Sequence, residues 1–439
     1  MSKRFLSCCL LLAGVLLGGY GIFSSAMPAV SAEGQLQKKS AGDDQQTSPG
    51  DPVARLQQQL ERGEVQLEYA EPGGYLQSVL KHLRVPISSQ GLVFSKTSFQ
   101  SNHISPTNPR AIYFNDDVYV GWIRGGELIE LSTVDPMIGG VFYALEQKPS
   151  ATPKIVRNES CMRCHVSGNT RYIPGHLVRS VFPEATGNSL ANFGSFITDH
   201  TSPFKDRWGG WYVTGSSGTE RHLGNQLFAD DSNPEHPELL TGSNLTSLDQ
   251  KVDLHGYASW HSDIVALMVL AHQTQMQNLM VWLGYETRMA LHQQDGIGTA
   301  PEKWSADTRW RIHYAADELL KYLLFTDEAR LRAPVTGTSG FAGEFVAGGP
   351  PDKRGRSLRD LDLKERLFRY PCSYLIYTDA FDAIPKPALD YLYRRLWLVL
   401  TGQAQEREFA ALSAADRKAI LEILRETKQN LPDYFQKGD

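Results

Sequence analysis

The amino-acid sequence predicts an α+β fold, with an antiparallel, β-rich N-terminal half that leads into a C-x-x-C-H motif and a helical C-terminal half. Two features of the chain carry this prediction. Short apolar runs separated by turn residues fill the stretch 110–145, which is typical of a β-meander. From about residue 257 onward, long segments have apolar residues at three- and four-residue spacing, which is typical of amphipathic helices.

The first 50 residues have the composition of an export signal and a leader. Two basic residues precede an apolar run over 5–23, and a small-residue pattern that suits signal peptidase ends at Ala32. We therefore expect a signal peptide over 1–32 and a periplasmic location, with an uncleaved membrane anchor as the alternative. Residues 33–50 are polar and lack periodicity, which predicts a disordered leader, and no later stretch reaches the length of a membrane span.

The region 51–256 is predicted to be β-rich and to carry the motif. Four strands with turn residues between them form the expected meander, at 110–114, 118–123, 127–131 and 140–145. Further elements are expected on either side of it, namely short helices near 51–64 and 74–83 and strands near 193–198 and 208–214. The meander leads directly into the motif.

The region 257–439 is predicted to be helical and to pack on the β-rich region. Its candidate helices lie at 259–292, 302–325, 387–401 and 414–428. The segment 333–357 is rich in glycine and proline and then basic, which predicts a long loop. Its basic run, 353–357, would be a solvated turn or a docking point for an acidic redox partner.

Composition and charge narrow the range of partners. The chain is 41% hydrophobic and 21% charged, which is ordinary for a globular protein, and its formal net charge is -5. A negatively charged chain without a long basic block argues against nucleic acid or an anionic membrane as the main partner.

Cysteine usage indicates a cofactor rather than disulfides. Removal of the signal peptide leaves three cysteines, Cys161, Cys164 and Cys372, and an odd number fits a disulfide framework poorly. The pattern fits better if two thiols bind a cofactor and the third is buried. Cys372 lies in the aromatic-rich segment 368–377, so we expect it to behave as a buried apolar side chain.

Residues 161–165 have the sequence Cys-Met-Arg-Cys-His, which is the C-x-x-C-H pattern of covalent haem attachment. Two thiols three residues apart fit one helical turn and can reach both vinyl groups of a haem, and the adjacent imidazole can donate a nitrogen to iron. A thioredoxin-like cysteine pair does not explain the histidine, and a zinc site would need further ligands nearby. We therefore predict one haem c, covalently bound to Cys161 and Cys164, with His165 as an axial iron ligand.

The second axial ligand is not specified by the sequence. Small electron-transfer cytochromes supply a methionine some tens of residues after the motif, but none occurs here between Met162 and Met268. The candidates are therefore His176, His200, His222, His255, His261 and Met268. His261, Met268 and His272 share one stripe of an apolar helical segment, which would face haem or belong to an ordinary core.

Three arginines and one Arg-His pair are further candidates for haem contacts. Arg171, Arg179 or Arg207 could bind haem propionates, although surface arginines are the ordinary interpretation. Arg221 and His222 follow a tight turn, and a peroxidase uses such a pair over haem to move a proton and to stabilise the departing oxygen.

Segments on both sides of the motif give the chain a resemblance to a known type of protein. They are 108–110, 161–165, 174–180, 198–204, 208–212, 261–268 and 370–374. With them, the chain resembles the large monohaem cytochrome c domain-containing proteins of the bacterial cell envelope, over nearly all of the mature chain. The resemblance implies haem c at Cys161 and Cys164 with His165 as the proximal ligand, and it implies no substrate.

Size and motif together define the functional expectations. The chain is roughly four times as long as a small cytochrome needs to be, so we expect more than a small cytochrome c fold alone. We expect electron transfer through the haem, with a redox partner protein. The alternatives are a haem enzyme of the peroxidase type with an open sixth coordination position, and a haem-based redox or gas sensor.

Overall fold

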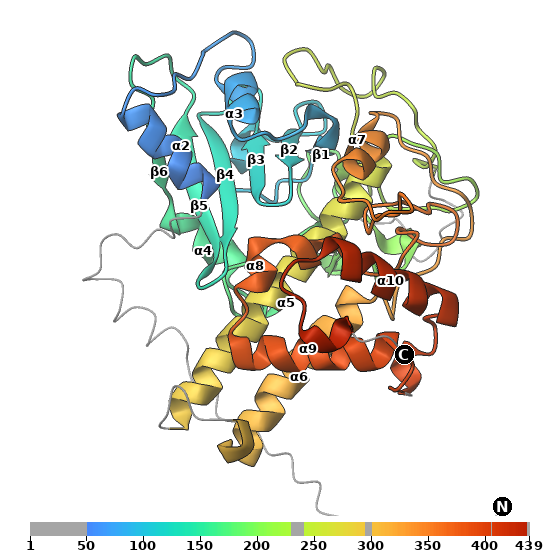
Figure 1. The fold of residues 1–439 in the computed structure, drawn as a ribbon. Coiled ribbons are helices and arrows are strands. Elements are labelled where there is room, and N and C mark those ends of the chain that lie inside the picture. Colours follow the sequence, from blue (N-terminus) through green and yellow to red (C-terminus); the bar gives the residue numbers. More distant parts are fainter. Residues whose placement is uncertain (1–50, 230–240, 295–300, 405, 437–439) are drawn as a thin grey trace, which may run out of the picture. The chain divides into compact units, whose positions relative to one another are not determined.

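The computed structural model describes residues 51–229, 241–294, 301–404 and 406–436. These residues form one packed unit with a mixed α+β fold, in which an antiparallel sheet occupies the N-terminal half and helices occupy the C-terminal half (Figure 1). The predicted fold class is confirmed at this level. The signal peptide predicted over 1–32 and the leader predicted over 33–50 lie outside the described residues.

A seven-stranded antiparallel sheet has the strand order β6-β5-β4-β3-β2-β1-β9. Its strands are β1 (Gly91–Val93), β2 (Arg110–Phe114), β3 (Val118–Trp122), β4 (Leu128–Asp135), β5 (Gly139–Glu146), β6 (Ile155–Arg157) and β9 (Trp211–Tyr212). β2 to β5 form the predicted meander, whereas β1 and β6 are too short to give a sequence signal. The strand predicted over 208–214 was mostly wrong: only β9 forms, because that is where the chain pairs with β1.

Helices cover the sheet and build the C-terminal half. The α-helices are α2 (Pro52–Glu61), α3 (Leu76–His82), α4 (Met162–His165), α5 (Ile264–Gln293), α6 (Ala306–Leu323), α7 (Phe341–Ala347), α8 (Asp379–Asp382), α9 (Lys386–Leu400) and α10 (Ala414–Thr427). The four long helices predicted for the C-terminal half are confirmed as α5, α6, α9 and α10. The remaining elements used below are β7 (Arg179–Val181) and β8 (Ser195–Ile197), which form a separate two-stranded sheet, and the 3-10 helices η3 (Glu159–Cys161) and η4 (Gly168–Thr170).

Both faces of the central sheet are buried, which explains why its strands lack a clean alternation of polar and apolar residues. On β3, Val118, Val120 and Trp122 belong to a core that residues of α2 and α3 complete. Tyr119 points to the opposite face, because successive side chains of a strand alternate, and joins a second core built around α5. The sheet is therefore a middle layer between two groups of helices.

α5 starts later than predicted. The prediction placed its start near residue 259, but the helix begins at Ile264, because the Asp263 carboxylate accepts hydrogen bonds from the N–H groups of the first turn. His261 therefore lies before the helix. Of the three residues predicted to share one helical stripe, Met268 and His272 lie on α5 and His261 does not.

The prediction of a long loop over 333–357 was wrong in its middle part, where α7 forms. Phe341 and Phe345 lie one helical turn apart in α7, and both are buried in the core around α5. The many glycines of the segment concealed this short helix, since its stability comes from two buried aromatic side chains rather than from helix propensity.

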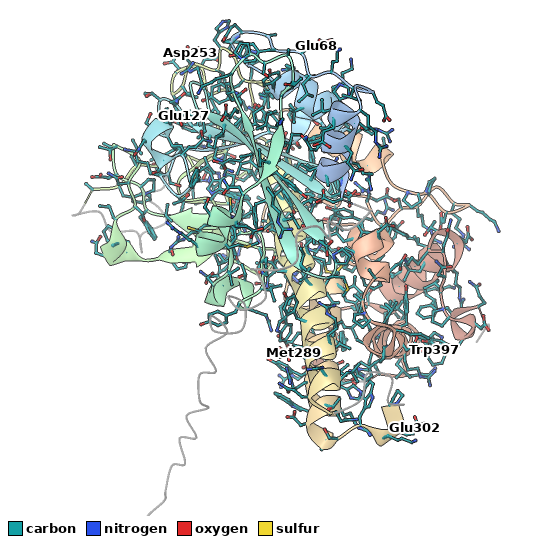
Figure 2. All side chains as sticks on the ribbon, turned by 90° about the vertical axis from the view of Figure 1, so that its left-hand side faces the viewer. Glu68, Glu127, Asp253, Met289, Glu302 and Trp397 are labelled. Carbon is teal, nitrogen blue, oxygen red and sulfur yellow. The ribbon has the colours of Figure 1, made fainter. Side chains whose placement is uncertain are left out.

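α5 connects the sheet to the helical half. Its 30 residues span about 45 Å at the usual rise of an α-helix. The first part of α5 packs on the sheet, and the later part, on which Figure 2 labels Met289, runs beside α6. Among the described helices, none is both long enough and apolar enough to cross a membrane.

Candidate functional site

The C-x-x-C-H motif forms a short helical turn that follows β6. Asn158 starts the turn, because its side-chain oxygen accepts a hydrogen bond from the N–H of Ser160. The helical backbone continues from η3 into α4. Cys161 is half-buried and Cys164 is exposed, and both are free thiols. Two thiols three residues apart in helical backbone lie on one side of the turn, which is what attachment to a single haem needs.

Arg110 on β2 and Glu130 on β4 form an ion pair on the sheet, and the Cys161 thiol lies near this pair. Burial and the negative charge of Glu130 raise the pKa of the Cys161 thiol to about 11. The thiol is therefore protonated at neutral pH, unlike the activated thiolate of a thioredoxin-like pair. The third cysteine, Cys372, is fully buried as predicted, and burial raises the pKa of its thiol as well.

His165 is fixed by hydrogen bonds to the backbone. Its Nδ1 lies 2.7 Å from the carbonyl oxygen of Gly175, and the N–H of Gly175 donates to the carbonyl of His165 at 3.0 Å. A carbonyl oxygen only accepts, so Nδ1 carries the proton and Nε2 presents its lone pair. Nε2 makes no hydrogen bond with any residue that the structure describes. Burial lowers the pKa of His165 and keeps the ring neutral, as a metal ligand must be.

The loop from His165 to Gly175 is tightly bent. Arg171 and Tyr172 both adopt left-handed backbone conformations, with φ of 54° and 60°. Such conformations cost about 1 kcal/mol or more for each non-glycine residue, so surrounding contacts must hold the bend. One of these contacts is the hydrogen bond from the N–H of Tyr172 to the carbonyl of Ser167, at 2.8 Å. The bend returns the chain to His165 and so places the Gly175 carbonyl.

His176 is the candidate ligand that lies beside His165, with ring centroids 6.1 Å apart. It is buried, its Nε2 lies 2.9 Å from Oγ of Ser132, and its ring stacks on Tyr119 at 4.4 Å. Its Nδ1 is buried without a hydrogen-bond partner among the described residues. Burial lowers the pKa of His176 to about 3, so the ring is neutral. Ligation of iron by its Nε2 would require the contact with Ser132 to break.

His200 and His272 form a pair in the helical core. Their Nδ1 atoms lie 2.8 Å apart, and Nε2 of His272 lies 2.8 Å from Oγ of Ser373. The ring of His200 stacks on Tyr322, with ring centroids 3.9 Å apart. Both histidines are buried, and burial lowers the pKa of each. The structure thus brings these two residues together and engages His272 through both of its ring nitrogens.

The other candidates have contacts of their own. His222 packs edge-on against Trp208, and its Nδ1 accepts a hydrogen bond from the backbone N–H two residues later, at 3.1 Å. Arg221 donates to backbone carbonyl groups of the preceding turn. His261 lies before α5 with a buried Nδ1 that has no partner in the described part of the chain, and Met268 is buried in the core around α5. Of the six candidates predicted as distal ligands, His176 is the one whose ring lies beside His165.

The three arginines considered for propionate binding differ in position. Arg171 belongs to the loop of the motif, where its guanidinium lies 4.0 Å from the ring centroid of Trp282 and pairs with Glu318 at 3.4 Å. Arg179 is exposed on β7. Arg207 is buried and donates to backbone carbonyl groups of its own segment. Arg171 is therefore the one that sequence and structure both place near the motif.

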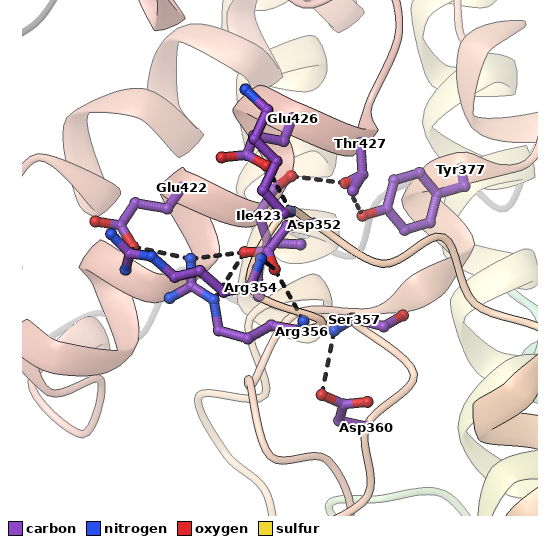
Figure 3. Close-up of polar contacts among 11 residues, drawn as sticks. Asp352, Arg354, Arg356, Ser357, Asp360, Tyr377, Glu422, Ile423, Glu426 and Thr427 are labelled. Atoms are coloured by element: carbon purple, nitrogen blue, oxygen red, sulfur yellow. Dashed lines mark hydrogen bonds and ion pairs between the residues drawn. The ribbon is translucent and has the colours of Figure 1, made fainter.

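The basic run 353–357 is tied to α10. Arg354 and Arg356 are directed toward Glu422 (Figure 3). They form ion pairs with its carboxylate at 2.8 and 2.9 Å, and Arg356 also contacts Asp352. The backbone N–H of Lys353 donates to a carboxylate of the same helix. The run is thus a structural connection between a loop and α10.

Sequence reasoning missed the residues that position His165. Gly175 supplies the accepting carbonyl, and Asn278 on α5 contacts the following residue, His176, which is 102 positions away in the chain. A polar amide in a largely apolar helix is the only sequence signal for Asn278, and it does not identify a partner.

The residues at the motif fit a haem c. Two free thiols share one turn, and a neutral imidazole presents Nε2 next to them. Haem brings four nitrogen ligands of its own, so one histidine suffices on the proximal side. Within the described ranges, no group of three or more His, Cys, Asp or Glu residues could hold a bare metal ion. Comparisons of the chain with protein-family models, curated proteins and solved structures gave no match.

Proposed function

We propose that this chain is a monohaem c-type protein of the periplasm that transfers electrons through haem c bound to Cys161 and Cys164, with His165 as an axial ligand. The observation that carries the proposal is the hydrogen bond from His165 Nδ1 to the carbonyl of Gly175 at 2.7 Å, beside two free thiols in one turn. This bond sets the tautomer whose Nε2 can bind iron. Bound haem would supply an iron that changes between the ferric and ferrous states.

In this function, the protein holds the imidazole and shields it from water. The ring of Phe142 packs on His165 with centroids 4.5 Å apart, and on His176 at 5.4 Å. Apolar surroundings favour the neutral imidazole. Cys164 is exposed, so the attachment point lies at the protein surface, where a redox partner protein can approach. The seven-stranded sheet and the long helices support a fold that is more than a small cytochrome c fold alone.

A second candidate function follows from the contacts of the distal candidates. His200 and His222 are held by hydrogen bonds elsewhere, and His176 uses Nε2 on Ser132. This arrangement supports a haem with an open sixth coordination position. A haem enzyme of the peroxidase type, or a haem-based redox or gas sensor, would need such a position.

The attachment is tested by producing the exported protein in a host that attaches haem c. The denatured wild-type protein should retain haem, detected as added mass on the peptide that contains Cys161 and Cys164. The double variant Cys161→Ala/Cys164→Ala should lose it, because no thioether can form. Cys372→Ala is the matched control and should keep its haem, since Cys372 is buried and is not part of the motif. Wild-type protein without covalent haem would overturn the proposal.

Absorption and EPR spectra then separate the two candidates. A low-spin, six-coordinate haem in both redox states supports the electron carrier and rejects the open-site alternative. A high-spin ferric haem that reacts with peroxide supports the open-site alternative and rejects the simple electron carrier. If the carrier spectrum is found, His176→Ala identifies whether His176 is the second ligand, because its loss would convert the iron to high spin.

A further inference from the structure

One peptide group links His165 to α5. The peptide between Gly175 and His176 accepts the Nδ1 proton of His165 on its carbonyl oxygen, at 2.7 Å. The N–H of the same peptide donates to Oδ1 of Asn278, on α5, at 3.0 Å. Because a peptide group is planar and rigid, a contact that holds its N–H also fixes the direction of its C=O. Asn278 therefore acts on the carbonyl that orients His165.

Asn278 fits closely against this peptide. It is 5% exposed, and its Nδ2 also donates to the carbonyl of His176, at 2.8 Å. A Cβ at position 175 would lie 2.4 Å from Oδ1 of Asn278, which is closer than atoms can pack, so only glycine allows this approach. Burial of an amide is unfavourable without such partners, and here both polar atoms of the side chain have one.

The ring of His176 is held from the same helix. It stacks on Tyr119 at 4.4 Å, and the hydroxyl of Tyr119 donates to Gln277, the residue before Asn278. Ser132 on β4 contacts Nε2 of the ring. Asn278 thus holds the backbone of His176 directly, and the preceding residue, Gln277, holds the ring of His176 through Tyr119.

We propose that Asn278 is a positioning residue for the axial histidine, an inference that rests on the proposed haem site. Asn278 fixes the peptide whose carbonyl holds the Nδ1 proton of His165, and hydrogen bonds in series through one peptide strengthen each other. A hydrogen bond at Nδ1 makes the imidazole a stronger donor to iron and so favours the ferric state. Loss of Asn278 should weaken this bond, raise the reduction potential and expose the Nδ1 proton to exchange.

Asn225 offers a matched control. Its Oδ1 accepts a hydrogen bond from the N–H of Val213 at 2.8 Å, and its Nδ2 donates to the carbonyl of Val213 at 2.8 Å. It is 6% exposed, so its burial matches that of Asn278. Its φ of 66° disfavours alanine. Asn225→Ala should therefore destabilise the fold at least as much as Asn278→Ala does. Its partners do not belong to the motif.

The experiment compares Asn278→Ala with Asn225→Ala in the haem-loaded protein. Asn278→Ala should retain covalent haem, show a higher reduction potential, and exchange the Nδ1 proton of His165 roughly tenfold faster, measured by NMR. Asn225→Ala should leave both quantities at their wild-type values. A wild-type potential and exchange rate in Asn278→Ala would overturn the inference.

Asn278→Asp provides a second variant in case the alanine variant does not fold. Aspartate keeps an oxygen that accepts from the N–H of His176, and it replaces the Nδ2 donor with a second, negatively charged carboxylate oxygen that faces the carbonyl of His176. Because the acceptor for the N–H is retained, exchange of the Nδ1 proton should stay near the wild-type rate. A tenfold faster exchange in this variant would contradict positioning through Oδ1. Failure of the proposed function is distinguishable, because the wild-type protein itself would then carry no covalent haem.

Discussion

Two sites in this protein hold histidines next to aromatic rings, and they use the imidazoles differently. At the motif, His165 donates Nδ1–H to a backbone carbonyl, and its Nε2 is bonded to no described residue. In the helical core, His272 uses Nδ1 toward His200 and Nε2 toward Ser373, both at 2.8 Å. The number of engaged ring nitrogens therefore separates a histidine that is available to a ligand from one that stabilises the fold.

The partners of the two sites also differ in kind. A backbone carbonyl only accepts, so it fixes one tautomer of His165. Two imidazoles that meet through Nδ1 share one proton, and either His200 or His272 can be the donor. Burial lowers the pKa of both members of the pair, so neither brings a charge into the core. The fixed tautomer leaves Nε2 of His165 open to a ligand, whereas the neutral pair contributes to packing.

Replacement of His272 by alanine should give the largest loss of stability. It removes the contacts with His200 and Ser373, takes from Nδ1 of buried His200 its hydrogen-bond partner and opens a cavity beside Phe325, whose ring centroid lies 4.5 Å away. We expect the free energy of unfolding to fall by roughly 3–5 kcal/mol, measured by denaturant titration. His165→Ala loses a single side-chain hydrogen bond and should cost about 1–2 kcal/mol. The opposite order of the two losses would contradict the comparison.

Acid should weaken the fold through its buried histidines. Burial lowers the pKa of His222 and His272 to about 3, below the value near 6.5 in an unfolded chain. The unfolded state therefore binds more protons between these values. The stabilising contribution is complete above about pH 6.5 and is lost as the pH falls toward 3. From pH 7 to pH 5, each histidine should lower the free energy of unfolding by about 2 kcal/mol.

This pH dependence is measured by denaturant titration at the two pH values. His222→Phe removes one titrating group and should reduce the loss between pH 7 and pH 5. His255→Gln is the control, because His255 is exposed, and should leave the loss unchanged. An equal effect of the two substitutions would show that burial does not distinguish these histidines.

The basic run should give the smallest effects, and it extends the comparison to charged groups. Arg354 is 67% exposed in its ion pair with Glu422, so Arg354→Ala should change the free energy of unfolding by less than about 0.5 kcal/mol. Arg356 also contacts Asp352, whose side chain is fully buried, so Arg356→Ala should cost about 1–2 kcal/mol. Thermal unfolding of both variants checks the order, and equal losses would show that exposure does not matter here.

The fold could be predicted where the signal is local. The meander and the four long helices follow from the spacing of apolar residues within each segment, and the structure has them. β9 and α7 could not be predicted in the same way. β9 has only two residues and exists because Trp211 and Tyr212 pair with β1, more than 100 positions earlier. α7 depends on a core that distant segments build.

In the candidate site, too, local features could be predicted and contacts between distant residues could not. The thiols and His165 could be predicted because they are consecutive in the motif. The contacts of the other histidines could not, because their partners are remote: His200 and His272 are 72 positions apart, and His176 and Asn278 are 102 apart. Sequence spacing indicated a candidate attachment site, and only tertiary structure shows which histidines already form hydrogen bonds with other residues.

The long helix α5 has a consequence for the order in which the site is completed. The hydrogen bond from His165 to Gly175 closes a loop of ten positions, so it can form as soon as that part of the chain exists. The bonds from α5 to His176 and Tyr119 join residues 102 and 158 positions apart. In a chain that emerges from its N-terminus, the two thiols and the bent loop are therefore present before Asn278 arrives. The turn and the bent loop can therefore form before the contact of Asn278 that holds the peptide of His176, and the length of the intervening chain sets the delay between them.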